Sequence, residues 1–153
     1  MLIRPANVKD IESIRILNTS IMEKVNQACD TDLVPYFAQT EAGKHYFIEA
    51  LERKDGCFFV AEDNNALVGY VNGGTKEVLY RKSKYFEIEN LGVSPDYKRS
   101  GIGTQLLETI TNWAKDHGYQ KIYLESYIKN SQAIAFYKKH GYQEIDISLE
   151  KNI

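Results

Sequence analysis

The chain has 153 residues, which predicts a single domain over residues 1–153. Apolar residues make up 43% and charged residues 26%, so the composition excludes a disordered chain. The 19 basic and 21 acidic side chains give a net charge of −2, which provides no overall basic field. We therefore expect neither nucleic acid nor an anionic membrane as a partner.

The cysteines and the start of the chain indicate the compartment. Cys29 and Cys57 form no CxxC spacing and no metal-ligand cluster, which argues against a disulfide scaffold or a structural zinc site. No signal-peptide pattern follows Met1, and no apolar run approaches the roughly 20 residues that a membrane span needs. We expect a cytoplasmic protein without a metal.

The first third of the chain predicts a strand and two helices. Residues 2–4 form a short apolar strand pattern that ends at Pro5, and Asn7 with Asp10 has the spacing of a helix capping box. Apolar residues then recur at helical spacing at positions 11, 14, 17 and 21. We expect a loop or broken helix over 26–39 and a second helix over 40–54.

The rest of the chain alternates strands and helices. Residues 57–61 and 66–71 flank the turn 63–65, whose asparagines tolerate the positive φ of a hairpin. We expect further strands at 85–93, 121–127 and 145–149, and helices at 101–117 and 131–140, each helix closed by a glycine. The order predicts an α/β (α+β) fold with a mixed sheet flanked by helices.

One segment has the chemistry of an anion site. Behind the strand at 85–93, Lys98 and Arg99 precede Gly101 and Gly103 at the start of a helix. The first turn of a helix has unpaired N–H groups and a partial positive charge, and glycines let phosphate oxygens approach the backbone. The alternative is that the glycines only close a turn and the basic pair is solvated. From the residues alone, both interpretations stay open.

Two common phosphate motifs fit less well. A Walker loop needs a lysine after its last glycine, but Thr104 follows Gly103. Glu125, 22 residues after Gly103, suits the ribose-binding acid of a dinucleotide site. However, Leu106 replaces the third glycine of that fingerprint, and Gly101 lies eight residues beyond the strand end. A dinucleotide-binding protein is therefore the weakest alternative.

Two linked motifs stand out in the second half of the chain. Residues 91–103 contain Leu-x-Val-x-Pro-x-Tyr at a strand end, followed by Lys98-x-x-Gly101-x-Gly103. The second motif, Asn-x-x-Ala-x-x-Phe-Tyr-x-x-x-Gly-Tyr, is formed by Asn130, Ala133, Phe136, Tyr137, Gly141 and Tyr142. Together with the opening residues 3–6 and the hairpin 59–70, these motifs resemble the GNAT superfamily of acetyl-CoA-dependent N-acetyltransferases, whose loop usually has Arg or Gln in place of Lys98.

The resemblance implies a mostly antiparallel sheet and transfer of an acetyl group from acetyl-CoA to a primary amine. In the family, the amine attacks the thioester directly and a tetrahedral intermediate forms. The loop binds phosphate mainly through its main-chain N–H groups, so Lys98 should preserve binding. The residues that the resemblance assigns to acetyl-CoA are Leu91, Val93, Lys98, Arg99, Ser100, Gly101, Ile102, Gly103, Thr104, Asn130 and Tyr137.

The resemblance also implies catalytic roles. It points to the main-chain N–H of Val93 for the oxyanion and to Tyr137 as the acid for the leaving thiolate. For the base, strand alternation places Glu87 and Glu89 on one face, where repulsion would bring one carboxylate closer to working pH. The alternatives are that both coat a solvated edge, that a bulge rotates one away, or that ordered water is the base.

The acceptor is not readable from the sequence. By family analogy, residues 22–54 line its pocket, and this segment offers acids and aromatics that suit a cationic amine: Glu23, Asp30, Asp32, Tyr36 and Phe37. A small-molecule amine and a peptide amine both stay open, as does a homodimer. The competing function is a non-catalytic acyl-CoA sensor on the same fold, because a fold does not fix a function.

Overall fold

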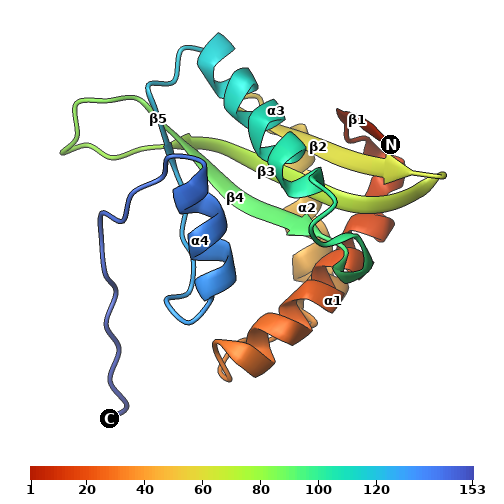
Figure 1. The fold of residues 1–153 in the computed structure, drawn as a ribbon, viewed down its shortest axis with the longest axis horizontal. Coiled ribbons are helices and arrows are strands. Elements are labelled where there is room, and N and C mark those ends of the chain that lie inside the picture. The colour runs from red at the N-terminus through yellow and green to blue at the C-terminus, as the bar shows by residue number, and fades with distance from the viewer.

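The computed structural model describes residues 1–153 and contains one five-stranded sheet with helices on both faces (Figure 1). The strands are β1 (Leu2–Pro5), β2 (Gly56–Asp63), β3 (Ala66–Lys76), β4 (Tyr85–Val93) and β5 (Lys121–Tyr123). The helices are α1 (Ile11–Ala28), α2 (Glu41–Glu52), α3 (Ile102–Asp116) and α4 (Ser131–Lys139). Short 3₁₀ helices occupy Val8–Asp10, Phe37–Gln39 and Pro95–Tyr97.

The sheet follows the order β1-β2-β3-β4-β5, and only the β4–β5 pair is parallel. The predicted mixed, mostly antiparallel sheet is thus confirmed. The β2–β3 hairpin turns through Asn64 and Asn65, both at positive φ (49° and 62°), as the sequence predicts. None of the helices is both long and apolar enough to cross a membrane.

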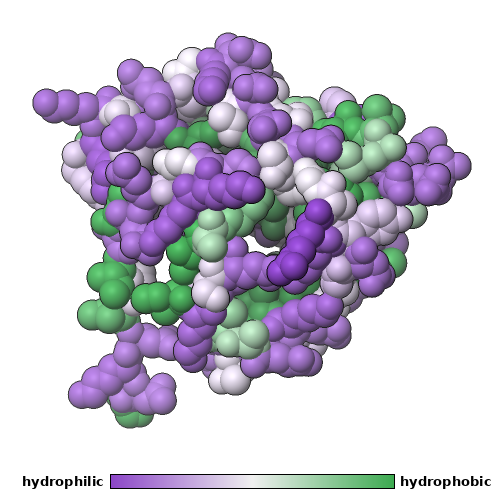
Figure 2. All heavy atoms as spheres, viewed as in Figure 1, coloured by the Kyte–Doolittle hydropathy of each residue, from purple (hydrophilic) through white to green (hydrophobic).

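Each face of the sheet has its own hydrophobic core. The first core joins the sheet to α3 and includes Phe86, Ile88, Leu106 and Ile110. The second joins the opposite face to α1 and α2 around Ile14, Phe47, Phe58, Val60 and Tyr70. Burying one such side chain typically contributes about 1.5–3 kcal/mol, so the two cores fix the helices on opposite faces. Figure 2 shows the outside of one view as mainly hydrophilic, with scattered hydrophobic residues.

The predicted capping box caps the 3₁₀ helix Val8–Asp10, which leads directly into α1. The Asn7 side chain accepts from the Lys9 N–H, and Asp10 Oδ2 accepts from the Asn7 N–H at 2.8 Å. Arg4 on β1 forks onto both Asp10 oxygens (2.8 and 2.9 Å) and onto Glu62 of β2 (2.8 Å). Hydrogen bonding from Arg4 lowers the pKa of Asp10. This ion-pair network ties β1, β2 and the first helix together.

Two predictions for the C-terminal part are wrong. The strand expected over 121–127 pairs only at Lys121–Tyr123. The last strand expected over 145–149 does not form, because no strand lies beside it. Its apolar side chains at Ile145, Ile147 and Leu149 are 54, 72 and 88% exposed, in a segment that extends away from α4 (Figure 1). Alternating apolar residues predict an extended strand, but they do not predict a neighbouring strand with which it can pair.

Candidate functional site

The sheet opens between β4 and β5. The two strands pair only from Tyr85↔Lys121 to Glu87↔Tyr123, whereas β4 continues to Val93 beside β3. Beyond Glu87, the outer edge of β4 therefore has no strand partner. An open strand edge exposes main-chain donors and acceptors that an extended ligand can pair with.

The direction of the β4 amides follows from the pairing with β3. The Ser94 N–H donates to Val68 O at 2.8 Å, which makes 94 and 68 a hydrogen-bonded pair. In an antiparallel ladder, the next residue pair points its N–H groups away from the partner strand. The pair Gly69↔Val93 is that next pair, so the Val93 N–H faces the open edge. The N–H of Leu91, two residues earlier in β4, points the same way and also faces the open edge.

The loop between β4 and α3 presents more free amides. The N–H groups of Arg99, Gly101, Ile102, Gly103 and Thr104 make no hydrogen bond to a protein acceptor. Arg99 and Gly101 have positive φ (64° and 85°), which turns successive amides toward a common point. Such a concave set of N–H groups at a helix start attracts anions. The predicted anion cradle is therefore present as geometry.

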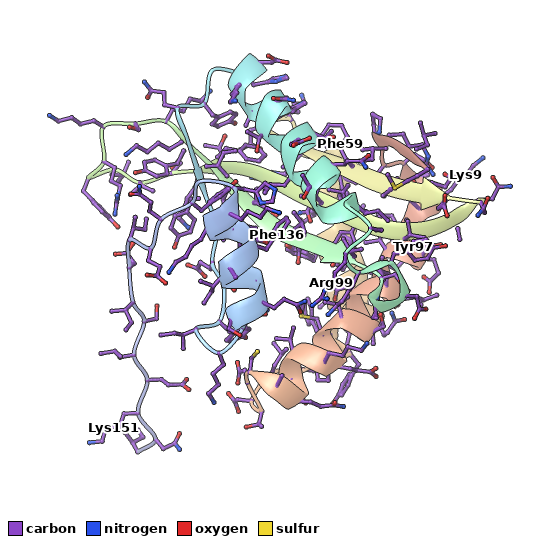
Figure 3. All side chains as sticks on the ribbon, viewed as in Figure 1. Lys9, Phe59, Tyr97, Arg99, Phe136 and Lys151 are labelled. Atoms are coloured by element: carbon purple, nitrogen blue, oxygen red, sulfur yellow. The ribbon has the colours of Figure 1, made fainter.

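Space in front of these amides is open. A Cβ added at Gly101 would meet no atom within 4 Å, and one added at Gly103 would lie 3.6 Å from the Phe136 ring, an ordinary contact. Figure 3 shows Arg99 in this loop and Phe136 on the side of α4 that faces α3. Packing inside the protein thus does not require Gly103. The loop fits a ligand that approaches the backbone closely, and the exposed Lys98 and Arg99 flank it.

The second motif forms α4, next to the start of α3. Asn130 caps α4 by accepting from the Ala133 N–H at 3.2 Å, and His140 Nε2 lies 3.2 Å from Thr104 Oγ1. Tyr137 packs its ring against Phe136 and Tyr142, with centroids 5.2 and 5.6 Å apart. Burial raises the pKa of Tyr137 to about 12, so its phenol is neutral at pH 7. The phenol oxygen has no protein hydrogen-bond partner and is available as a donor.

Both predicted bases carry an ion pair. Lys76 Nζ lies 3.2 Å from both carboxylate oxygens of Glu87. Glu89 accepts from Arg53 Nη1 and, at 3.0 Å, from Asn72 Nδ2. The two glutamate side chains are about a quarter exposed, so each carboxylate is paired and partly shielded.

A β-bulge places Glu89. The register passes from Asn72↔Asn90 to Gly73↔Ile88, so Glu89 is the extra residue of β4. Asn90 donates to the Tyr46 hydroxyl at 2.8 Å, and that hydroxyl lies 3.5 Å from Glu89 Oε2. Burial and the Glu89 charge raise the pKa of Tyr46. The bulge therefore keeps Glu89 on the α2 face and brings Asn90 there too, rather than rotating Glu89 away.

Sequence reasoning missed Tyr46, Arg53 and Asn72, which complete this polar network. Asn72 is 0% exposed, and its Oδ1 has no hydrogen-bond partner in the protein. An unpaired buried oxygen costs about 1–3 kcal/mol, and such atoms are rare outside functional sites. Asn72 directly follows the apolar run 66–71 of β3, which is the signal that could have identified it.

Comparison with known proteins assigns the family. The model of the acetyltransferase (GNAT) family matches residues 22–142. The chain belongs to the GNAT acetyltransferase family. It is 28% identical over 144 residues to an N-alpha-acetyltransferase of Sulfurisphaera tokodaii, with 90% of this chain and 81% of that protein covered.

Solved structures share the fold of this GNAT enzyme. A putative acetyl transferase from Pyrococcus furiosus superposes with a TM-score of 0.79 at 27% identity and covers 99% of both chains. The aminoglycoside N-acetyltransferase AAC(6')-Iy in complex with CoA reaches a TM-score of 0.77 at 17% identity, covering 99% of this chain and 93% of that one. At that identity, the second likeness concerns the fold alone.

In this GNAT enzyme, the segment from α1 to α2 carries unpaired acids. Glu23 and Asp32 are exposed, and neither they nor Asp30 forms an ion pair with a basic side chain. Tyr36 and Phe37 are 61 and 46% exposed. Burial and the carboxylate of Asp30 raise the pKa of Tyr127, which follows β5. The α1–α2 connection therefore lies against the segment after β5, on the far side of the open β4 edge.

Proposed function

We propose that this enzyme transfers the acetyl group of acetyl-CoA to a primary amine. The observation that carries the proposal is the pairing of a free-amide cradle at residues 99–104 with an open β4 edge that ends at Val93. A diphosphate fits the cradle, and a peptide-like pantetheine arm fits the strand edge. The printed description of AAC(6')-Iy in complex with CoA supports the same ligand class.

The chain would hold acetyl-CoA through main-chain groups. The amides of Arg99, Gly101, Ile102, Gly103 and Thr104 would donate to the diphosphate, and Lys98, Arg99 and Ser100 would flank it. Leu91 and Val93 would pair with the arm. Asn130 would contact the ligand from the start of α4, next to its capping bond.

Two groups would stabilise charge during transfer. When bound, acetyl-CoA supplies the thioester carbon that the neutral amine attacks. The Val93 N–H would donate to the developing oxyanion. Tyr137 would donate a hydrogen bond to the leaving thiolate. Its pKa of about 12, against about 8.5 for an ordinary thiol, makes complete proton transfer uphill by roughly 5 kcal/mol, so hydrogen bonding is its main contribution.

The acceptor would enter over the α1–α2 face. Glu87 and Glu89 lie on that side, with Tyr46 and Asn72 beside Glu89. The unpaired acids Glu23, Asp30 and Asp32 would favour a cationic amine. Both a peptide N-terminus and a small polyamine-like molecule satisfy this requirement, and either would reach the site as an ammonium ion that must lose a proton.

Two measurements on the purified chain test the proposal. A thermal-shift series with acetyl-CoA, longer acyl-CoAs, NADH and ATP should show stabilisation by acyl-CoAs alone. Thiol release from acetyl-CoA should then depend on an added amine, tested with cationic small molecules and with peptides. Stabilisation without turnover on any amine would favour the acyl-CoA sensor. Stabilisation by NADH alone would overturn the assignment of the loop.

A further inference from the structure

Arg53, the residue that ends α2, lies in a seat made by two glycines. A Cβ added at Gly74 would come within 2.1 Å of Arg53 Cζ, and one added at Gly56 within 2.8 Å of Arg53 Cδ. The guanidinium therefore lies directly against the β3 backbone. A side chain at position 74 would displace the guanidinium, so glycine at this position is what permits the close approach of Arg53.

From this seat, Arg53 joins three elements. Its Nε donates to Asp55 Oδ1 at 3.1 Å, its Nη2 donates to Asp55 Oδ2 at 3.4 Å, and its Nη1 donates to Glu89. The Arg53 and Glu89 side chains are 25 and 24% exposed, so this ion pair is partly shielded from water. The partners Asp55 and Glu89 together raise the pKa of Arg53, which keeps it cationic. One planar cation thus connects the end of α2, the start of β2 and the bulge of β4.

The surroundings of Glu89 differ from those of Glu87. Glu89 faces Arg53 and Tyr46 from α2, Asn72 from β3 and, through Arg53, the Asp55 carboxylate. Glu87 pairs with the ammonium of Lys76, which also lies 4.1 Å above the Tyr123 ring, and the Glu87 charge contributes to the raised pKa of Tyr123. The Arg53 guanidinium is held by its two bonds to Asp55 and offers one N–H to Glu89, whereas a lysine acts as a mobile point charge.

We propose that Arg53 is a positioning residue that orients Glu89 as the group that takes the proton of the acceptor ammonium. This inference rests on the proposed acetyl transfer. The ammonium N–H bond breaks, and an O–H bond forms on Glu89, either directly or through one water. The neutral amine keeps the electron pair that attacks the thioester. Glu89 then returns the proton to solvent, and the second amine proton ends on the CoA thiol.

The ion pair between Arg53 and Glu89 should affect the pH dependence of the reaction. A cation beside a carboxylate favours the ionised form, and the effect is typically about one to three pH units. Loss of Arg53 should therefore move the acid limb of the kcat/KM profile to higher pH by about one unit. The variant should lose more activity on the acid limb of its profile than on the plateau. A purely structural role would lower activity equally on the limb and on the plateau.

Three variants test the proposal. Arg53→Gln removes the cation. Gly74→Ala keeps Arg53 but fills its seat, and should reproduce the shift of the acid limb. Lys76→Gln is the matched control, because it removes the cation beside Glu87 on the same strand and should leave the limb in place. Arg53→Lys keeps a cation but loses the planar guanidinium, so its acid limb should lie between those of the wild type and Arg53→Gln.

A readout without substrates separates this inference from the proposed function. In the free protein, ¹³C NMR follows proton uptake by Glu89, with its resonance identified from Glu89→Gln. Uptake should occur at higher pH in Arg53→Gln and Gly74→Ala than in the wild type, and should be unchanged in Lys76→Gln.

An unmoved Glu89 resonance would overturn the inference even in an active enzyme. A shifted resonance in a protein that acetylates no amine would keep the ion pair but end the proposed function. If the acid limb of the kcat/KM profile moves only in Lys76→Gln, then Glu87 takes the proton instead of Glu89.

Discussion

Gly101 offers a direct test of the anion cradle, because the chain contains a matched control. Gly101 and Gly118 have φ values of 85° and 79°, and a Cβ added to either would meet no atom within 4 Å. Gly101 begins α3 and Gly118 follows its end. Alanine at either position should therefore impose the same backbone strain without a clash. Only Gly101→Ala should disturb ligand binding.

The two effects can be estimated separately. Left-handed backbone costs an L-residue about 1–2 kcal/mol, which lowers Tm by roughly 2–8 °C for a chain of this size. A ligand at 100 times its Kd stabilises the fold by about 2.7 kcal/mol. Losing one charge-assisted hydrogen bond to phosphate costs about 1.5–3 kcal/mol, or about 10- to 150-fold in Kd. At about 100-fold weaker binding, the same ligand concentration contributes only about 0.4 kcal/mol.

Differential scanning fluorimetry with and without acetyl-CoA measures both quantities. Without ligand, Gly101→Ala and Gly118→Ala should melt at similar temperatures, below the wild type. With ligand, Gly118→Ala should keep the full wild-type shift, and Gly101→Ala should lose most of it. Equal ligand-induced shifts in the two variants would refute the reasoning, because the amides at Gly101 would then not contact the ligand.

Two further predictions concern catalysis and pH-dependent stability. Tyr137→Phe should lower kcat about 10- to 100-fold through the lost hydrogen bond to thiolate, with unchanged acetyl-CoA affinity by calorimetry. Tyr142→Phe, its ring neighbour, is the control, and an equal loss there would remove the role of Tyr137. Because Arg4 lowers the pKa of Asp10, the ionised form stabilises the fold above about pH 4, and this contribution disappears as pH falls through the folded value. Asp10→Asn should therefore cost about 1–2 kcal/mol in urea unfolding at pH 7 and less at pH 3, and an equal cost at both would contradict the ion-pair account.

Local signals in the sequence predicted most of the fold. The capping box at Asn7, the hairpin at Asn64 and the helix start near Gly101 all depend on residues within a few positions of each other, and the structure has all three. The last strand at 145–149 failed because its formation depends on a neighbour, which a local pattern does not contain. The roles assigned to Val93 and Tyr137 stay predictions.

The polar network around Glu89 could not be predicted from spacing alone. Arg53 and Glu89 are 36 residues apart, and their contact depends on the end of α2 passing over two glycines of the sheet. Alternation indicated that Glu87 and Glu89 share a face, but it gave no information about the cation that each would meet. Such pairings follow from the packing of helix on sheet, which only the folded chain defines.

The bulge itself left a signal in the sequence. The α3 core receives Phe86, Ile88, Leu91 and Val93, so the apolar spacing in β4 is two, three and two residues. A single step of three in a period-two pattern means that one extra residue has been inserted. That residue, Glu89, gives the acceptor face its carboxylate. It also reverses the phase of the strand, so that the Val93 side chain enters the core while its N–H faces the open edge. The same insertion therefore sets the position of the proposed base and the direction of the proposed oxyanion donor, which couples the two halves of the site through one strand.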